Sequence, residues 1–445
     1  MRLTFCGGVG EVSGANYLLE SGGIKIIIDC GLHQGNVFSE KHNWEPFAYD
    51  PKEISAALIT HAHIDHTGLL PKLLRDGFRG KIYSTEPTRD FTELLLLDSE
   101  HILFQEAERY GKPALYGVRD VEEMMARWNV IPYHQEINIG PFKIVFYNAA
   151  HILGSSFIVI EADGKKIVFS GDLGNSPAPL LGTTEIFEDA DYCVIESAYG
   201  DRVHHETQDG LIEDVIEDTV SAGGILMIPA FAMERTQKLL FDINELMENG
   251  RVPKIPVFLD SPLAIKMTAV YKKHQDFMDK ETLKLLKGDE SLFDFPQLRK
   301  TLTVEQSKSI NDAPLPKIII AGSGMSQGGR ILHHEKRYLS DSKNTILFVG
   351  YQAKNSLGRR IQEGSKIVKI HNEDIPVRCR VAVVEYYSAH ADQPQLLDWL
   401  RTMRLYLQKV FVVQGEDGLA PLAHKIIDEL AIKAEIPKEG DSFMI

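Results

Sequence analysis

Short apolar runs, separated by glycine and polar turns, follow one another along the first two hundred residues. Residues 17–20 and 24–29 flank the turn sequence Ser-Gly-Gly, which predicts a β-hairpin. Residues 54–60 are apolar along most of their length, as expected of a buried strand. An apolar-faced helix is predicted at 68–74. Further strands are predicted at 142–147, 157–161, 166–170 and 192–196.

After Gly200 the pattern becomes an alternation of strands and helices, which predicts a parallel α/β sheet. Strands are predicted at 225–229, 256–260, 317–321 and 345–349, and helices at 206–222, 234–247, most of 262–300, and 328–338. The polar and glycine-rich strand ends at 260–261, 322–324 and 350–352 should share the carboxyl-end edge of that sheet, where such sheets bind ligands.

Short strands return from about residue 361, at 366–371, 381–387 and 410–413, with a helix at 393–407. The chain is therefore predicted to consist of a discontinuous β-rich domain, residues 1–205 and 361–445, with an α/β domain of residues 206–360 inserted into it.

Composition and charge narrow the class of protein. The 445 residues are 44% hydrophobic and 25% charged, so a full core can be buried. No apolar run reaches the ~18–20 residues that span a bilayer, and no signal peptide is recognised, so we expect a cytoplasmic protein without a membrane partner. The four cysteines form no C-x-x-C pair and are predicted to be reduced thiols. A net charge of −15 excludes broad basic surfaces but allows a local basic groove.

The sequence His61-Ala62-His63-Ile64-Asp65-His66 carries the clearest chemical signal. Three imidazoles and a carboxylate are costly to bury together unless they bind a metal. A surface histidine patch is the alternative, which the apolar strand before and the leucine-rich helix after disfavour. In a turn, His61 and His63 can converge on one ion while Asp65 and His66 face a second. Imidazole and carboxylate without thiolate suit zinc best, with manganese or iron as alternatives.

Other candidate ligands follow predicted strands: His151 after 142–147, Asp172 after 166–170, and His390 after 381–387. The small residues Ser170 and Gly171 would let Asp172 approach another group closely, as a carboxylate bridging two cations must. Taken singly, each has an ordinary explanation as a turn aspartate or a hydrogen-bonded histidine.

Together these positions resemble the motif pattern of the metallo-β-lactamase superfamily. Asp29 matches its first motif, and the 61–66 cluster, His151 and Asp172 match the next three. Glu196 and His390, which flank the predicted insertion, are similar to the β-CASP branch of nucleic-acid nucleases. Segments 196–202 and 321–325 resemble its prokaryotic RNA-processing members, the homologues of the nuclease subunit of the cleavage and polyadenylation specificity factor. The implied fold is an αββα sandwich with an inserted parallel-sheet α/β domain.

The resemblance also implies roles for single residues. The ligands it implies for two zinc ions are His61, His63 and His151 for the first, Asp65, His66 and His390 for the second, and Asp172 as the bridge. Asp29 would orient a cluster histidine, and Glu196 would support a nearby catalytic or ligand group.

The expected activity is hydrolysis of single-stranded RNA by a hydroxide held between two metals ~3.5–4 Å apart. We expect endonucleolytic RNA processing, with 5′-exonuclease action as a second mode, by a monomer or homodimer. The alternatives are a DNA nuclease of the Artemis class, a small-substrate hydrolase such as a thioesterase, and an RNA-binding subunit without activity. Metal content and substrate assays distinguish these classes.

Phosphate contacts are predicted on the inserted domain. Its candidate residues are Ser323 and Gly324 at a strand-to-helix turn, with Arg330, Lys354, Arg359 and Arg360 completing a basic groove. The resemblance further implies a histidine, as proton donor to the leaving group, where this chain has Arg360. An arginine with a pKa above ~12 is a poor donor at neutral pH. The donor stays open between water and another residue, such as His333 or His334.

Overall fold

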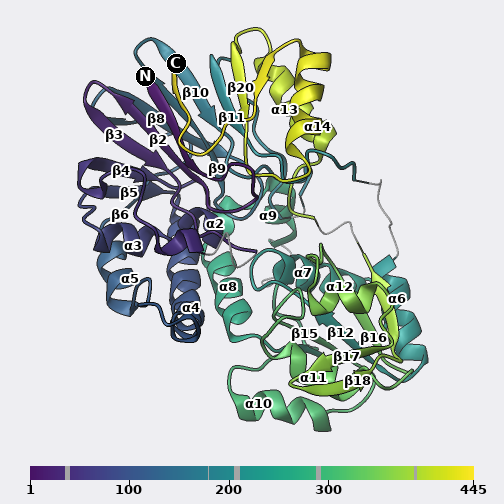
Figure 1. Ribbon diagram of the computed structural model, residues 1–445. Helices are drawn as coiled ribbons and strands as arrows, with labels where there is room; N and C mark the ends of the chain where they lie inside the picture. Colours follow the sequence, from purple (N-terminus) through teal and green to yellow (C-terminus); the bar gives the residue numbers. More distant parts are fainter. Residues whose placement is uncertain (36–40, 179, 205–210, 287–291, 385–387) are drawn as a thin grey trace. The chain divides into compact units, whose positions relative to one another are not determined.

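The computed structural model describes residues 1–35, 41–178, 180–204, 211–286, 292–384 and 388–445. They form two compact units, one of residues 1–203 and 390–445 and one of residues 204–389 (Figure 1). Three predicted elements extend beyond the described residues: the strand at 381–387 at positions 385–387, the helix at 206–222 at positions 206–210, and the mostly helical segment 262–300 at positions 287–291. Each unit is a separate structural body with its own sheets.

Two seven-stranded sheets form the first unit. One has the order β22-β1-β2-β3-β4-β5-β6, with β1 Arg2–Gly7, β2 Asn16–Ser21, β3 Ile24–Ile28, β4 Ile54–Leu58, β5 Lys81–Ser84, β6 Trp128–Val130 and β22 Ser442–Met444. The other has the order β21-β20-β11-β10-β9-β8-β7, with β7 Ile137–Ile139, β8 Phe142–Asn148, β9 Ser156–Ala162, β10 Lys165–Phe169, β11 Tyr192–Ile195, β20 Lys409–Val412 and β21 Lys433–Glu435. The predicted hairpin is β2–β3, which pair antiparallel across Gly22 and Gly23.

Side chains that alternate along these strands explain the layers, because successive strand residues point to opposite faces. Ile26 and Ile28 of β3 pack between the sheets with Ile144 of β8, whereas Ile27 packs outward against helices. The outer layer on the first sheet contains α3 Leu70–Arg75, α4 Glu86–Tyr110 and α5 Val118–Met125, and that on the second contains α13 Gln393–Met403 and α14 Leu419–Lys425. The expected αββα sandwich is therefore confirmed.

The second unit is built on a six-stranded, all-parallel sheet of order β14-β13-β15-β12-β16-β19. Its strands are β12 Ile225–Pro229, β13 Val257–Leu259, β14 Leu298–Lys300, β15 Lys317–Ala321, β16 Thr345–Phe348 and β19 Arg380–Val383. Its helices are α6 Leu211–Ser221, α7 Arg235–Glu248, α8 Pro262–Lys273, α9 Lys280–Leu286, α10 Val304–Ser309, α11 Ile331–Tyr338 and α12 Leu357–Gln362. Strands β12 and β15 are buried at every position, as in a sheet covered on both faces. The inserted parallel sheet is confirmed.

Two details differ from the predicted organisation. Residues 361–389 lie with the second unit, because β19 extends its sheet by pairing with β16, and β17 Ile367–Ile370 and β18 Glu373–Pro376 form a separate hairpin. The first unit thus resumes at residue 390 rather than 361. The segment predicted as mostly helical, 262–300, ends in strand β14, which pairs with β13. None of the helices in the described part of the chain has the length and apolar character that spanning a membrane requires.

Candidate metal centre

The histidine cluster follows strand β4 and continues into the short helix α2, Ile64–Thr67. His63 is the residue immediately before this helix, and Asp65 and His66 lie within it. The hydroxyl of Thr67 donates to the carbonyls of Ala62 and His63, which holds the turn closed. The turn therefore holds the side chains of the cluster close to one another, where they face two sides of a common centre.

Asp29, which directly follows β3, holds this turn in place through contacts of its carboxylate. One carboxylate oxygen accepts from the backbone N–H of Thr60 at 2.8 Å, and the other accepts from the Thr60 hydroxyl at 2.8 Å. The second oxygen also lies 2.7 Å from Nδ1 of His66. A carboxylate accepts a proton-bearing Nδ1, so Nε2 of His66 is left to face the centre. This contact fits the orienting role that the family resemblance implies for Asp29.

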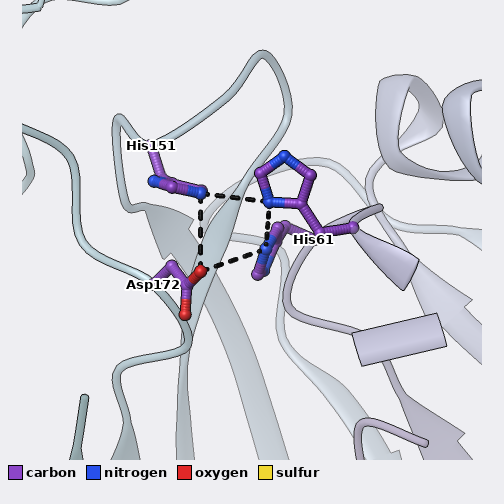
Figure 2. Close-up of side chains that lie close together, drawn as sticks. His61, His151 and Asp172 are labelled. Carbon is purple, nitrogen blue, oxygen red and sulfur yellow. Dashed lines mark hydrogen bonds and ion pairs between the residues drawn. The ribbon is translucent and has the colours of Figure 1, made fainter. Parts of the chain in front are cut away.

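Four ligand atoms converge on the first side of the centre: Nε2 of His61, Nδ1 of His63, Nε2 of His151 and a carboxylate oxygen of Asp172. Nδ1 of His63 lies 3.0 Å from His61 Nε2 and 3.2 Å from His151 Nε2. Oδ2 of Asp172 lies 3.5 Å from both Nε2 atoms, and Figure 2 shows His61 and His151 turned toward it. Tetrahedral zinc with bonds of ~2.0–2.1 Å needs ligand atoms roughly 3.3 Å apart. The four residues therefore fit a zinc ion.

Charge states on this side also suit a metal. Burial holds the pKa of His61 well below its ordinary value, and the neighbouring His66 adds to the effect, so His61 is neutral and its lone pair is available. Burial alone would raise the pKa of Asp172, but His66 and His61 outweigh it and hold that pKa well below the ordinary range. Asp172 is thus an anion among buried imidazoles, as a ligand between cations should be.

The second side of the centre contains Asp65, His66 and the other oxygen of Asp172. Nε2 of His66 lies 3.3 Å from Oδ1 of Asp172 and 3.8 Å from Oδ2 of Asp65. Burial opposes a charge on His66, but Asp172 and Asp29 hold its pKa well above the ordinary value. Two carboxylates around one imidazole thus attract a positive charge to this position, which a metal ion can supply in place of a proton.

His390 lies beside Asp172, but it is grouped with Glu196 rather than with Asp65 and His66. Its Nδ1 lies 3.2 Å from Oε2 of Glu196 and 3.9 Å from Oδ2 of Asp172. Glu196 is fully buried, and its Oε1 accepts from the backbone N–H of Leu173 at 2.6 Å. Burial opposes protonation of His390, but Glu196 raises its pKa to about 10. The role of His390 as a ligand of the second ion stays a prediction.

Gly171 makes the approach of Asp172 feasible. It has a φ of +53°, and a Cβ at this position would lie 2.7 Å from the Cβ of Thr60. A larger residue would push the strand end away from the turn that holds the histidines. This close approach agrees with the prediction that small neighbours serve Asp172.

Sequence reasoning missed Gln414, which follows strand β20 and is buried at the second side of the centre. Its Nε2 lies 2.7 Å from Nε2 of His66 and 3.4 Å from Oδ1 of Asp172. It also missed Thr60, which links Asp29 to the turn. The signal for Gln414 was available, because a polar residue at a strand end is the feature that identified His151 and Asp172.

The predicted phosphate contacts all belong to the second unit, and several have partners there. Arg330 donates to Asp260 at 2.8 Å and to two backbone carbonyls, and Arg359 pairs with Glu363 at 2.7 Å. The hydroxyl of Ser323 accepts from two backbone N–H groups of the turn that follows it. Gly324 lies against Phe231 and accepts from the amide of Gln352 at 3.0 Å.

The remaining candidates of the second unit differ in exposure. Lys354 and Arg360 are exposed. His334 is buried and bound to Asp260 at 2.7 Å, so one candidate proton donor is already engaged in the fold of its own unit.

Family models match three parts of the chain. Residues 9–214 match the metallo-β-lactamase superfamily, residues 236–361 the β-CASP domain, and residues 374–437 the RNA specificity domain of zinc-dependent metallo-hydrolases. The first match lies almost wholly in the first unit and the second match lies in the second unit. The third match covers the end of the second unit and much of the C-terminal part of the first.

Relatives extend over nearly the whole chain. Ribonuclease TTHA0252 of Thermus thermophilus is 37% identical over 419 residues, which cover 94% of each chain. An RNase J-like protein of Methanocaldococcus jannaschii is 31% identical over 93% of this chain and 92% of its own. Transcription termination factor FttA of Methanosarcina mazei is 32% identical over 97% of this chain and 70% of its own. A crystal structure of a protein of unknown function from Enterococcus faecalis, 11% identical, has a TM-score of 0.58 with coverage of 100% and 99%, which shows a shared fold alone.

Proposed function

Because this chain belongs to the metallo-β-lactamase superfamily, in its β-CASP ribonuclease family, we propose that it is a zinc-dependent ribonuclease that processes single-stranded RNA endonucleolytically. The observation that carries the proposal is the convergence of His61, His63, His151 and Asp172 at distances that suit a metal ion. Ions bound here supply activation of water and neutralisation of charge on the phosphate.

The chain's own residues hold that chemistry in place. We assign His61, His63 and His151 to the first ion, Asp65 and His66 to the second, and Asp172 to both. Asp29 fixes the ring of His66 by accepting its Nδ1 proton, so that Nε2 points into the centre. Burial of His61, His66, His151 and Asp172 restricts the positions of their ligand atoms.

Glu196 and His390 are proposed to handle the proton that the leaving oxygen needs. Glu196 is fixed by the N–H of Leu173 and holds Nδ1 of His390 beside Asp172. An imidazole held in this way can carry a proton next to the reacting phosphate. This role is an alternative to the predicted one as a ligand of the second ion, and it supplies the donor that Arg360 does not.

RNA is favoured over other substrates by two observations. The RNA specificity model covers residues 374–437, and the relative that matches most of this chain at 37% identity is named a ribonuclease. Phosphodiesters also suit a centre with two adjacent cation positions sharing one carboxylate. The proposed phosphate contacts are the exposed Lys354 and Arg360 and the Ser323–Gly324 turn. Arg330 and Arg359 join them only after they release Asp260 and Glu363.

The test compares zinc-loaded protein on a single-stranded RNA, the DNA of the same sequence, a circular RNA and a thioester. We expect both RNAs to be cleaved. Cleavage of the circular RNA would establish endonuclease action, because a circular molecule has no end at which an exonuclease could begin. Asp172→Asn is the matched variant, and it should lower turnover at least a thousandfold because it removes the shared anion from the centre.

Each other outcome contradicts a stated part of the proposal. Equal or faster cleavage of DNA would contradict the RNA preference. An untouched circular RNA beside a degraded linear one would exclude endonuclease action. Thioester hydrolysis without RNA cleavage would place the enzyme among the small-substrate hydrolases of the superfamily.

A further inference from the structure

Tyr199 and Arg202 form a cation–π pair beside the metal centre, in the segment that follows strand β11. The centroid of the Tyr199 ring lies 5.6 Å from that of the His390 ring, with an angle of 48° between the ring planes. The guanidinium carbon of Arg202 lies over the same tyrosine ring, 4.6 Å from its centroid. The tyrosine ring therefore lies between the imidazole beside Asp172 and a side chain with a permanent positive charge.

The backbone of this segment is fixed by contacts with other parts of the first unit. The N–H of Gln393, the first residue of α13, donates to the carbonyl of Arg202 at 3.0 Å, and the side-chain amide of Gln393 donates to the carbonyl of Gly200. The N–H of Arg202 turns back to the carbonyl of Tyr199 at 3.1 Å. A Cβ on Gly200 would lie 2.5 Å from the carbonyl oxygen of Gly418, so a larger residue there would push the segments apart. The start of α13 thus holds the backbone from which both side chains extend.

The side chain of Arg202 is accessible to a ligand although it has partners in the fold. It is 43% exposed, and its Nε lies 3.6 Å from a carboxylate oxygen of Asp201, which is 31% exposed. Water screens an ion pair in so exposed a position, so a phosphate can displace the carboxylate. The attraction between the guanidinium and the Tyr199 ring uses none of the N–H donors. The ring can therefore hold the guanidinium in place while those donors bind a ligand.

The charges around the metal centre give a cation at this place a use in binding RNA. Asp65, Asp172 and Glu196 place three carboxylates in and beside the centre, and the chain has a net charge of −15. A strand of phosphates that enters such surroundings is repelled unless cations lie along its path. Bound metal ions neutralise that repulsion at the reacting phosphate. Arg202 places a fixed positive charge farther along, on the side of His390.

We propose that Arg202, held in place by Tyr199, binds the RNA phosphate next to the reacting one on the side of the leaving oxygen. The inference rests on the proposed ribonuclease function, in which His390 supplies the proton to that oxygen, and it adds a substrate contact within the first unit. The nucleotide that carries the leaving oxygen then lies beside His390, and its other phosphate reaches the guanidinium. Phosphate oxygens match the fork of N–H groups of an arginine and are the same in every nucleotide, so the contact strengthens binding without selecting a base.

The first test compares steady-state cleavage of one single-stranded RNA by the zinc-loaded full-length protein and its variants. Arg202→Ala should raise KM about tenfold and change kcat less than about twofold, because the contact is made equally in the ground state and the transition state. Arg202→Lys should recover part of the lost affinity, since lysine keeps the charge but lacks the planar fork. Arg119→Ala is the matched control, because Arg119 is an exposed arginine on α5 of the same unit.

A substrate with a single neutral phosphate locates the contact. A methylphosphonate replaces each phosphate near the mapped cleavage site in turn. At the phosphate next to the cleavage site on the leaving side, the replacement should raise KM for the wild-type chain but not raise it further for Arg202→Ala.

The dependence of RNA binding on salt gives a measure that needs no turnover. The Asp172→Asn chain binds RNA that it does not cleave, and fluorescence anisotropy measures its Kd over a range of salt concentrations. Adding Arg202→Ala should reduce the slope of log Kd against log salt by about 0.7, the share of one phosphate of a single strand.

A double variant tests the part that Tyr199 plays. Tyr199→Leu should raise KM, and combining it with Arg202→Ala should raise KM no further than Arg202→Ala alone, because the ring acts through the guanidinium. Effects that multiply in full would show that the tyrosine acts independently, and would overturn this part of the inference.

Two results would overturn the phosphate contact. One is a folded Arg202→Ala chain with the wild-type KM and the wild-type salt dependence, and the other is a methylphosphonate effect that persists unchanged in that variant. Melting curves followed by circular dichroism establish folding, and Arg202→Lys keeps the test decisive should the alanine variant unfold. A wild-type chain that cleaves no RNA would instead contradict the proposed function, so the two failures are distinguishable.

Discussion

Two buried carboxylates act on histidines of the metal centre in the same way. Asp29 contacts Nδ1 of His66 at 2.7 Å, and Glu196 contacts Nδ1 of His390 at 3.2 Å. Such a contact fixes which ring nitrogen carries the proton and how the ring is oriented. For His66 the result is that Nε2 faces Asp172. For His390 the result is a ring held beside Asp172 that can serve either as a ligand or as a proton donor.

Replacing His390 separates these two roles. We expect His390→Ala to lower kcat on RNA about 100- to 10,000-fold, the range that general acid catalysis contributes, while bound metal stays at the wild-type level. Elemental analysis and single-turnover cleavage measure the two quantities. His134→Ala, an exposed histidine of the same unit, is the control. Loss of one bound ion in the His390 variant would establish the predicted ligand role and contradict the proton-donor role.

At the scale of elements, the ends of strands carry the chemistry, and their backbones turn sharply there. Asp29 after β3, Ala150 between β8 and β9, and Gln414 after β20 all have positive φ, at +59°, +53° and +47°. Asp29 and Gln414 each contact His66 through their side chains, and Ala150 directly precedes His151, whose side chain faces the centre. In the second unit, Glu335 of helix α11 shows how burial raises the pKa of a carboxyl group.

Glu335 predicts a pH dependence of stability. It is fully buried, Ser326 donates to its Oε1, and its Oε2 has no hydrogen-bond partner among the described residues. Burial raises its pKa from 4.5 to about 8. Between pH 4.5 and about 8 the folded chain therefore holds a proton that the unfolded chain releases. The free energy of unfolding consequently falls as the pH rises through this range. From pH 6 to 9 we expect the free energy of unfolding to fall by about 3 kcal/mol, since each pH unit below the folded pKa is worth about 1.4 kcal/mol.

Glu335→Gln should abolish most of that loss, because an amide does not ionise. Urea unfolding at pH 6 and pH 9 measures it, with Glu217→Gln as the control, since Glu217 is exposed on α6 of the same unit. An unchanged pH slope in the Glu335 variant would show that another group causes the dependence.

At the scale of the whole molecule, the two units have separate cores. The core clusters of the sandwich contain residues of the first unit, and the cluster around β12, β15 and β16 contains residues of the second. All proposed metal ligands, from His61 to Asp172, belong to the first unit. A bound ion therefore stabilises one of the two cores directly.

Removing the metal should consequently lower one melting transition and leave the other in place. A ligand at about a thousand times its dissociation constant contributes about 4 kcal/mol to the unit that binds it. Calorimetry of zinc-loaded protein with and without a chelator measures the shift, and chelator added to metal-stripped protein is the control. Equal shifts of both transitions, or one transition throughout, would contradict independent unfolding of the two units.

Patterns along the chain predicted the inserted parallel sheet and identified His61, His63, His151 and Asp172, whereas the sandwich and Asp29 followed from the family resemblance. Apolar periodicity and polar strand ends are local properties, so they can be read along the chain. The partners of His390, the place of Gln414 and the return to the first unit at residue 390 became known from the three-dimensional structure. These depend on which distant strands pair, as β19 does with β16, and a strand's own sequence does not specify its neighbour.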